Sequence, residues 1–209
     1  MKQFNLVSGH IQVEQNPSVI LGWQPNYDRD PHVIYAVDQN FRIVHCNRAW
    51  DTFALENNGA AAKQKKVRGV YLFAVIPRDL SKFYGAGFES ARQHGRWQHV
   101  FDCSSARVIR RLRMTVTPFG SGFLIRNVSV KDTLAPPSDA DGNFADYGPV
   151  ITMCCHCRRV ENKKTSVWQW VPEFIEETPV EFHSRLCPAC WTYHYGETGQ
   201  SGEAPISAA

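Results

Sequence analysis

The sequence contains no long run of apolar residues. No stretch of its 209 residues approaches the roughly 18–20 consecutive apolar residues that a membrane-spanning helix needs. The first fifteen residues, MKQFNLVSGHIQVEQ, also lack the apolar segment of a secretory signal. We therefore expect a cytoplasmic protein without membrane contacts.

The sequence also lacks the motifs of the common catalytic classes. It has no phosphate-binding loop of the Walker type, no G-x-S-x-G nucleophile turn, and no cyclase or phosphodiesterase signature. We therefore expect that the chain is not an enzyme, and that a protein partner or effector in trans delivers its output.

Charge is unevenly distributed along the chain. The net charge is +3, but the residues through Val130 carry +8 and the remainder carries −5. The basic first part leaves nucleic-acid binding open as an alternative function, whereas the acidic remainder disfavours it. Arg111 and Arg113 alternate with Leu112 and Met114, which is typical of a sheet with one solvated face.

Alternating apolar residues predict a hairpin and a helix near the start of the chain. Residues 33–37 and 41–45 flank the turn DQN and alternate in the manner of two strands. Asn47 is a suitable N-cap for a helix that begins at Arg48, and ENNG ends that helix.

A longer helix and three strands are predicted next. The helix runs from Leu80 to about His94, with Asp79 as its N-cap and Gly95 as its stop signal. The segments WQHVFDC, ARVIRRLRMTVTPF and GFLIRNVSV then predict three strands.

The order of these elements over residues 33–130, with AVDQNFRIVHCNRAWDTFA near its start, resembles a PAS domain. Asn47, Ala49 and Trp50 match the N-x-A-aromatic step of that family. The resemblance implies an α+β fold in which a five-stranded antiparallel sheet cups small helices over an internal pocket. It also implies a domain that senses a small ligand or mediates homodimerisation.

The residues do not favour any particular PAS cofactor. The flavin-binding LOV branch uses G-x-N-C-R-F-L-Q, which is absent here, because HCNRAW places Cys46 before the helix. A haem needs an axial histidine, and we interpret His94 as a helix-end residue and His99 as a core or solvated imidazole. Haem or another PAS ligand remains open but is disfavoured by these residues, and no cofactor-binding residue is assigned. The apolar stripe at helical spacing is interpreted as ordinary core: Leu80, Phe83, Tyr84 and Phe88.

Composition divides the chain into further segments. Residues 131–148 are rich in Pro, Asp and Gly without periodicity, which predicts a linker. We expect an N-terminal extension over 1–32, a PAS-like domain over 33–130 and a zinc-binding module over 149–195. The tail, 196–209, has the composition of a disordered segment.

Five of the seven cysteines lie in MCCHC and LCPAC, which contain two C-x2-C pairs. Cytoplasmic thiols are usually reduced, and two such pairs have the ligand spacing of a structural zinc site. The 29 residues between the pairs are explained by a predicted strand in SVWQW and a short helix at Pro172. We therefore expect structural Zn²⁺ bound by Cys154, Cys157, Cys187 and Cys190. Cys155, His156 and His183 stay open as further ligands.

Other uses of these cysteines fit less well. Haem attachment needs C-x-x-C-H, but Arg158 follows Cys157 and Trp191 follows Cys190. A thioredoxin-type redox site uses one reactive pair in a βαβ setting, so two matched pairs are redundant for that role. We expect the basic residues after Cys157 to offset the negative charge of a four-thiolate site: Arg158, Arg159, Lys163 and Lys164.

The segment MCCHCRRV…WQWVPEFIEE…FHSRLCPACW resembles a short cysteine-paired module that follows sensory domains in many bacterial signalling proteins. In that module the second pair is commonly preceded by F-S-H-G, whereas FHSR here transposes His and Ser and has Arg185 in place of Gly. The resemblance implies a small zinc-ribbon-like module.

These observations lead to one principal hypothesis and two alternatives. The principal hypothesis is a non-enzymatic cytoplasmic signalling or regulatory protein whose PAS-like domain senses a small ligand or mediates dimerisation and whose zinc module docks a partner. We also expect a homodimer through the PAS-like domain. One alternative is a nucleic-acid-binding transcriptional regulator. The other is a zinc-thiolate redox switch, in which oxidation of a cysteine releases the metal.

Overall fold

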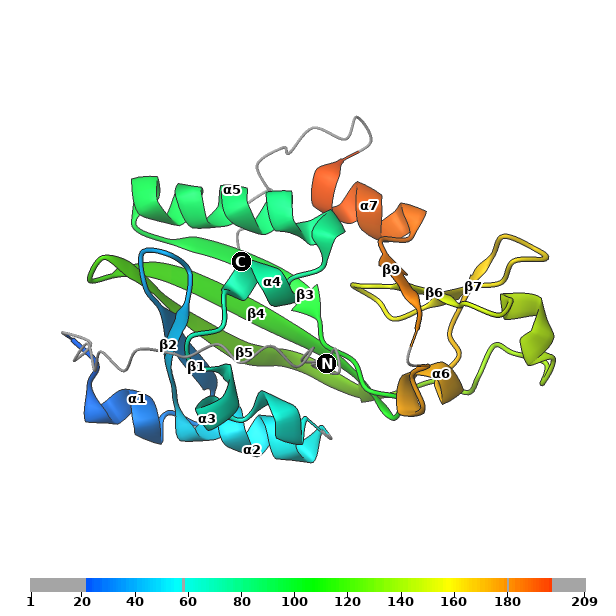
Figure 1. The fold of residues 1–209 in the computed structure, drawn as a ribbon, viewed down its shortest axis with the longest axis horizontal. Coiled ribbons are helices and arrows are strands. Elements are labelled where there is room, and N and C mark those ends of the chain that lie inside the picture. Colours follow the sequence, from blue (N-terminus) through cyan, green and yellow to red (C-terminus); the bar gives the residue numbers. More distant parts are fainter. Residues whose placement is uncertain (1–21, 58, 180, 197–209) are drawn as a thin grey trace. The chain divides into compact units, whose positions relative to one another are not determined.

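The computed structural model describes residues 22–57, 59–179 and 181–196 (Figure 1). The predictions made for residues 1–21 and 197–209 lie outside this part of the chain. The chain divides into two compact units, each built from several segments. The first unit contains the described residues through Ile76 together with Gly87–Gln98 and Arg113–Val128. The second contains Pro77–Ala86, His99–Leu112 and the residues from Ser129 onward.

A five-stranded antiparallel sheet confirms the α+β class predicted from the sequence. Its strand order is β2-β1-β5-β4-β3, and β1 pairs antiparallel with both β2 and β5. The loop between β3 and β4 is closed by hydrogen bonds from Cys103 N–H to the Arg110 carbonyl and from Ser105 N–H to the Val108 carbonyl. The strands are β1 (Val33–Val37), β2 (Ile43–Cys46), β3 (Trp97–Asp102), β4 (Val108–Phe119) and β5 (Gly122–Leu134).

The predicted hairpin is present as β1 and β2. The Asp38 carboxylate accepts hydrogen bonds from the backbone N–H groups of Asn40 and Arg42, which fixes the turn. Gly122 begins β5 where a Cβ atom would lie 2.0 Å from the Val37 carbonyl oxygen, so this close approach requires glycine.

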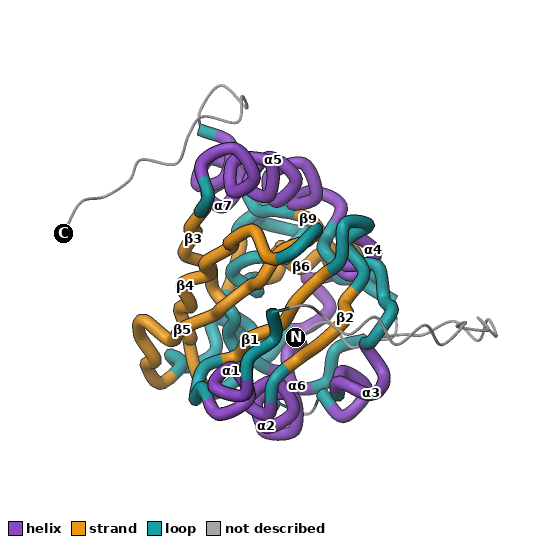
Figure 2. The backbone as a smooth tube through the Cα atoms, turned by 90° about the vertical axis from the view of Figure 1, so that its left-hand side faces the viewer, coloured by secondary structure: helices purple, strands orange, loops and turns teal. Residues whose placement is uncertain are grey.

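Short helices surround β1 and β2 in the first unit. Figure 2 shows α1, α2 and α3 grouped together, and α1 contacts α2. Asn47 caps α2 as predicted, because its side-chain oxygen accepts the Trp50 N–H at 3.1 Å. The helices are α1 (Pro25–Arg29), α2 (Arg48–Glu56), α3 (Gln64–Val67) and α4 (Leu72–Val75), with a 3-10 turn at Ala60–Ala62.

Phenylalanine rings fill the centre of the first unit. The ring of Phe41 packs on those of Phe73, Phe88 and Phe123, with centroid separations of 5.1, 5.2 and 5.8 Å. The predicted apolar stripe of the long helix is buried, which confirms its interpretation as core: Phe88 in the first unit, and Leu80, Phe83 and Tyr84 in the second. On β4, Leu112 and Met114 are buried while Arg111 and Arg113 are exposed, as the alternation predicts.

The long helix α5 (Arg78–His94) begins earlier than predicted. Asp79 is its second residue and not its N-cap, because the Leu80 N–H already bonds to the Pro77 carbonyl. The Asp79 carboxylate has a different partner, described below. No helix in the described ranges is long and apolar enough to span a bilayer.

The second unit contains a small sheet in the order β8-β7-β6-β9. Its strands are β6 (Thr152–Cys154), β7 (Val160–Glu161), β8 (Trp168–Gln169) and β9 (His183–Arg185). The predicted strand in SVWQW is β8, and the predicted short helix is α6 (Glu173–Glu176), with Pro172 as its N-cap. The last element in the described part of the chain is α7 (Pro188–Tyr195).

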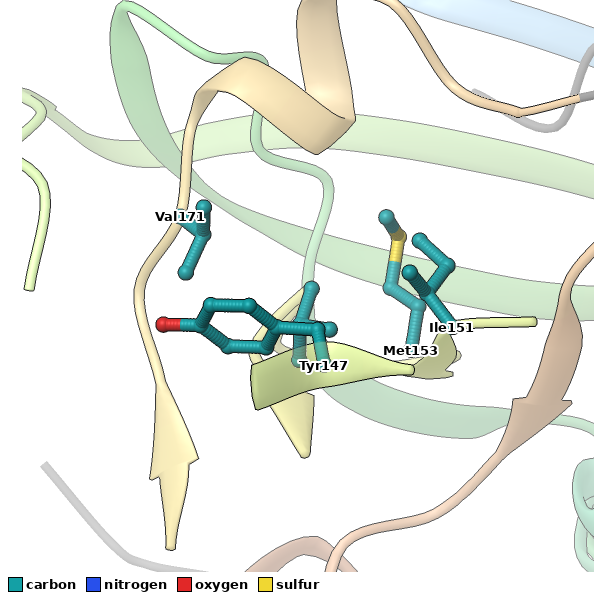
Figure 3. Packing of buried hydrophobic residues seen from close by; sticks show 5 residues of the cluster. Tyr147, Ile151, Met153 and Val171 are labelled. Atoms are coloured by element: carbon teal, nitrogen blue, oxygen red, sulfur yellow. The ribbon is translucent and has the colours of Figure 1, made fainter. Parts of the chain in front are cut away.

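The segment expected to be a linker contributes to this unit. β5 continues to Leu134, and a 3-10 turn at Phe144–Tyr147 follows. Tyr147 is buried beside Ile151, Met153, Val160 and Val171, and Figure 3 shows its ring extending toward Val171. Its hydroxyl donates to the Gln169 side-chain oxygen at 3.0 Å. Composition conceals this role because the segment is rich in Pro, Asp and Gly and its aromatic residues, Phe144 and Tyr147, show no periodicity.

Candidate metal centre

The first cysteine pair lies at the turn between β6 and β7. Cys154 ends β6, its N–H donates to the Arg159 carbonyl at 2.7 Å, and its own carbonyl accepts the Arg158 N–H at 3.1 Å. Arg158 has φ of 66°, a left-handed conformation that closes the turn. The turn therefore brings the side chains of Cys154 and Cys157 to the same side.

The second pair lies at the start of α7. Cys187 is the N-cap residue, Pro188 is the first helical residue, and Cys190 lies in the first turn. Strand β9 pairs in parallel with β6, so that Arg185 lies opposite Cys154. The Cys155 N–H also donates to the Arg185 carbonyl at 2.9 Å. Strand pairing thus aligns the two cysteine pairs, and Arg185, where the resemblance has glycine, occupies the end of a strand.

The four predicted thiols form one cluster. The Sγ atoms of Cys154, Cys157, Cys187 and Cys190 all lie within 4.8 Å of one another, and those of Cys157 and Cys187 are 3.9 Å apart. A disulfide would require about 2.05 Å, and every cysteine is free. A tetrahedral ion with sulfur ligands at about 2.3 Å would place the sulfurs roughly 3.8 Å apart. The cluster is therefore placed so that it could hold a metal ion.

The electrostatics of the cluster favour a cation at its centre. Hydrogen bonds from Cys157, Cys187 and Cys190 lower the pKa of the Cys154 thiol. The interaction with Cys154 in turn raises the pKa of Cys157 and of Cys190. The pKa of Cys187 is lowered as well, to about 7, because the opposing effect of Cys154 is outweighed by the hydrogen bonds that Cys157 and Cys190 donate to it. Two thiols are therefore stabilised as thiolates, and their neighbours Cys157 and Cys190 are held protonated. Four thiolates coexist only when a bound cation offsets their charge.

The basic residues after Cys157 do not act together as expected. Burial lowers the pKa of Arg158, and the thiols of Cys103 and Cys154 act in the opposite direction, so this guanidinium lies near the cluster. The Lys163 ammonium instead contacts the Glu161 carboxylate and the Thr152 hydroxyl. The expectation is wrong for Lys163 because the Glu161 carboxylate competes for its ammonium group. Lys164 likewise pairs with Asp146 at 3.5 Å, and Arg159 is exposed.

The three residues left open as ligands lie outside the cluster. Among the described residues, the group of thiols, imidazoles and carboxylates close enough to share an ion contains the four cysteines alone. The Nδ1 atom of His156 lies 2.9 Å from Nε2 of His194. His183 is exposed on β9, and Cys155 is half-buried.

A layer of imidazole and aromatic rings lies beside the cysteine turns. His99 packs on Phe83 at a centroid distance of 4.6 Å, and His194 packs on Phe83 at 4.7 Å. Burial lowers the pKa of His99 to about 4 and that of His194 to about 3, so both rings are neutral at pH 7. His99 is therefore a core imidazole. His94 is exposed in the last turn of α5, as predicted.

The sequence analysis did not single out His194 or Asp102. His194 lies four residues after Cys190 and therefore on the same helix face, a signal that helical spacing could have provided. The Asp102 carboxylate lies 3.6 Å from His156 Nε2, a contact between residues 54 positions apart that no local pattern contains.

A surface hollow of the first unit lies near its short helices. It measures about 620 Å³ and is lined by α1, α2 and the residues after α1, among them Asp28, Arg48 and Phe53. Carboxylates, guanidinium groups and an aromatic ring share its walls, so no single ligand class is favoured.

Comparison with known proteins adds little beyond the fold. No protein-family model and no curated protein matches the chain. One solved structure that is similar is the photoactive yellow protein domain of the sensor histidine kinase Ppr from Rhodospirillum centenum. It has 17% identity, covers 53% of this chain and 97% of that chain, and gives a TM-score of 0.37.

Two other solved structures have comparable likeness. A domain of an HTR-like protein from Haloarcula marismortui has 16% identity, with 49% of this chain and all (100%) of that chain covered, at a TM-score of 0.35. The PAS domain of BvgS from Bordetella pertussis has 19% identity. The match covers 48% of this chain and 74% of that chain, at a TM-score of 0.34. At TM-scores below 0.5 these likenesses carry no functional argument.

Proposed function

We propose that the chain is a non-enzymatic cytoplasmic signalling or regulatory protein. In this proposal the PAS-like domain of residues 33–130 senses a small ligand or mediates homodimerisation. A module over 149–195, held together by structural zinc, docks a protein partner.

The closed geometry of the thiol cluster carries this proposal. Two turns that are distant in sequence supply two sulfurs each, and three of the four cysteines are buried. An ion with four thiolate ligands has no open position for a substrate, so such a site stabilises structure and does not catalyse a reaction. Thiolates also favour zinc over the oxygen-seeking ions Mg²⁺ and Ca²⁺.

The small size of the apolar core in the second unit supports a structural role for the ion. One buried apolar cluster of this unit has five members, Tyr147, Ile151, Met153, Val160 and Val171. Bound zinc would cross-link the β6–β7 turn to the start of α7 and neutralise the thiolates, and its binding energy would add to the folding free energy. The first turn of α7 would also stabilise Cys187 and Cys190 as thiolates through its positive end.

Exposed aromatic residues on the metal-bearing helix support partner docking. Trp191 is 44% exposed and Tyr193 is 55% exposed. Tryptophan and tyrosine are enriched in protein interfaces because they contribute large apolar area. The Tyr193 hydroxyl donates to the Val100 carbonyl, so its ring is held in place and its exposed face is what a partner would contact. The acidic balance of the remainder of the chain favours a protein partner over nucleic acid at this helix.

Elemental analysis and an absorption spectrum of the purified protein test the proposal. We expect one zinc ion per chain, no visible absorption, and loss of the metal when Cys154 or Cys187 is replaced by serine. Iron bound to the four thiolates would colour the protein and contradict the choice of metal. A protein that retains no metal would contradict the structural site, and turnover of a substrate by the chain alone would contradict the non-enzymatic role. Sedimentation analysis tests the homodimer separately.

A further inference from the structure

The segment that carries the second cysteine pair is hydrogen-bonded to one residue in the first turn of α5, Asp79. The backbone N–H of Leu186, immediately before Cys187, donates to the Asp79 carboxylate at 2.9 Å. The hydroxyl of Tyr195, the last residue of α7, donates to the Asp79 backbone carbonyl. Both ends of the segment that carries Cys187 and Cys190 are therefore bonded to Asp79.

The surroundings of these bonds are well packed. Leu186 is 5% exposed and Tyr195 is 4% exposed. The ring of Phe83, one turn after Asp79, packs on His194 at 4.7 Å and on Tyr195 at 6.1 Å. A buried N–H group that loses its acceptor costs about 1–3 kcal/mol, so the Leu186 N–H depends on the Asp79 carboxylate.

The Leu186 N–H immediately precedes a hydrogen bond to one of the thiols. The next residue, Cys187, uses its own N–H to donate to the Cys154 sulfur at 3.4 Å. The orientation of the Leu186–Cys187 peptide thus determines both where the Cys187 side chain starts and whether Cys154 receives this hydrogen bond. Asp79 fixes the preceding peptide, Arg185–Leu186, whose carbonyl accepts the Cys155 N–H. It therefore orients the backbone one residue before Cys187, although it is not itself a metal ligand.

We propose that Asp79 is the positioning residue of the metal centre, and that metal binding to the four cysteines is thereby coupled to the ordering of the first two turns of α5. The inference rests on the proposed function, because it requires that the cysteines bind a metal. Such coupling is reciprocal: metal binding stabilises the start of α5, and any change that displaces the start of α5 weakens metal binding. The helix continues to His94, so the metal site is coupled to an element whose later residues belong to the first unit.

Metal affinity of the full chain measures the first half of this proposal. Zn²⁺ is titrated in competition with a chromophoric chelator, and Co²⁺ is used as a spectroscopic probe of the thiolate geometry. Asp79→Ala should weaken Zn²⁺ binding about 10- to 100-fold, the usual effect of removing a residue that orients a ligand. Asp79→Asn keeps an acceptor oxygen at the same place and should restore most of the affinity. Glu89→Ala, which removes an exposed carboxylate from the same helix, is the matched control and should leave the affinity unchanged.

Hydrogen exchange of the wild-type chain measures the second half without any substitution. Adding Zn²⁺ to the metal-free protein should slow exchange in residues 78–86, and this protection should be reduced in Tyr195→Phe, which lacks only the hydroxyl. A general loss of stability would instead increase exchange in β7 and β8 as well, and Asp79→Asn would not rescue it.

The outcomes separate this inference from the proposed function. If the wild-type chain binds neither Zn²⁺ nor Co²⁺, both are wrong. If the wild type binds Zn²⁺ but Asp79→Ala binds it equally well, the proposed function stands and the positioning role is refuted. If metal protects the cysteine turns and leaves exchange in residues 78–86 unchanged, the coupling to α5 is refuted.

Discussion

Asn47 provides the sharpest test of how the first unit is held together. This side chain is fully buried, and its oxygen accepts the N–H groups of Ile34 and Trp50, both at 3.1 Å. Its amide nitrogen donates to the carbonyls of Tyr27, Asp30 and His32 at 3.0, 3.3 and 2.8 Å. One side chain thus joins β1, the start of α2, and α1 with the segment that follows it.

The expected cost of Asn47→Ala follows from these bonds. Each is worth about 0.5–1.5 kcal/mol, so four or five of them amount to roughly 2–7 kcal/mol. Since whole domains are stable by only about 5–15 kcal/mol, we expect the hydrogen-exchange protection of β1, β2 and α2 to fall by several kcal/mol. Urea unfolding followed by hydrogen exchange and mass spectrometry measures this change in each segment of the full chain.

The matched control is the asparagine at the other end of the same helix. The Asn57 side chain donates to the Phe53 carbonyl at 2.8 Å, so Asn57→Ala should cost only about 1 kcal/mol. If Asn47→Ala costs no more than Asn57→Ala, the reasoning is refuted.

A second substitution at this position adds a pH signature. Asn47→Asp keeps the oxygen that accepts from Ile34 and Trp50 but directs a second oxygen at three carbonyls. This arrangement favours the protonated acid, so the pKa of the introduced carboxyl should lie above its unfolded value of about 3.9. The native state then binds more protons than the unfolded state just above that pH, and stability should increase as the pH falls toward 4. If the free energy of unfolding of Asn47→Asp differs from that of the wild type by the same amount at pH 7 and at pH 4, the assigned orientation of the amide is contradicted.

Three further predictions concern other parts of the chain. Cys190→Ser should abolish metal retention in elemental analysis, whereas Cys103→Ser, which lies outside the four-thiol group, should retain the metal. Gly87→Ala should lower the melting temperature at a cost of about 1–3 kcal/mol, because the new Cβ would lie 2.6 Å from the Trp97 ring. Gly85→Ala meets nothing within 4 Å and should be neutral or stabilise α5 by up to about 1 kcal/mol. Burial and the neighbouring His156 lower the pKa of His99 from 6.5 to about 4, and the ring also faces Phe83, Tyr84, Tyr193 and His194. The neutral ring therefore contributes stability that is lost as the pH falls from 6.5 toward 4, and His99→Phe should flatten this dependence in urea unfolding.

Each of these has a result that would contradict it. Equal metal loss from Cys103→Ser would indicate that the ion is not confined to the four thiols. Equal melting temperatures for Gly87→Ala and Gly85→Ala would show that Trp97 moves aside at little cost. An unchanged pH dependence in His99→Phe would assign the acid sensitivity to other groups.

Local sequence patterns determined the elements of this protein. The hairpin around DQN, the capping of α2 by Asn47 and the strands β3 to β5 follow from alternation, turn residues and caps, because each depends on neighbours within a few positions. The four cysteines that cluster were likewise predicted, since a C-x2-C turn brings two sulfurs together locally and two such turns suit one ion.

Tertiary structure alone decided how these elements are connected. The contribution of Tyr147 to the core, the pairing of β9 with β6 and the bonds from Leu186 and Tyr195 to Asp79 join residues that are far apart in sequence. Composition suggested a linker where Tyr147 is buried, and helix-capping rules assigned Asp79 to its own helix. Neither pattern could reveal the contacts that these residues make, because the partners of the Tyr147 ring and of the Asp79 carboxylate are distant in sequence and come close only when the chain folds.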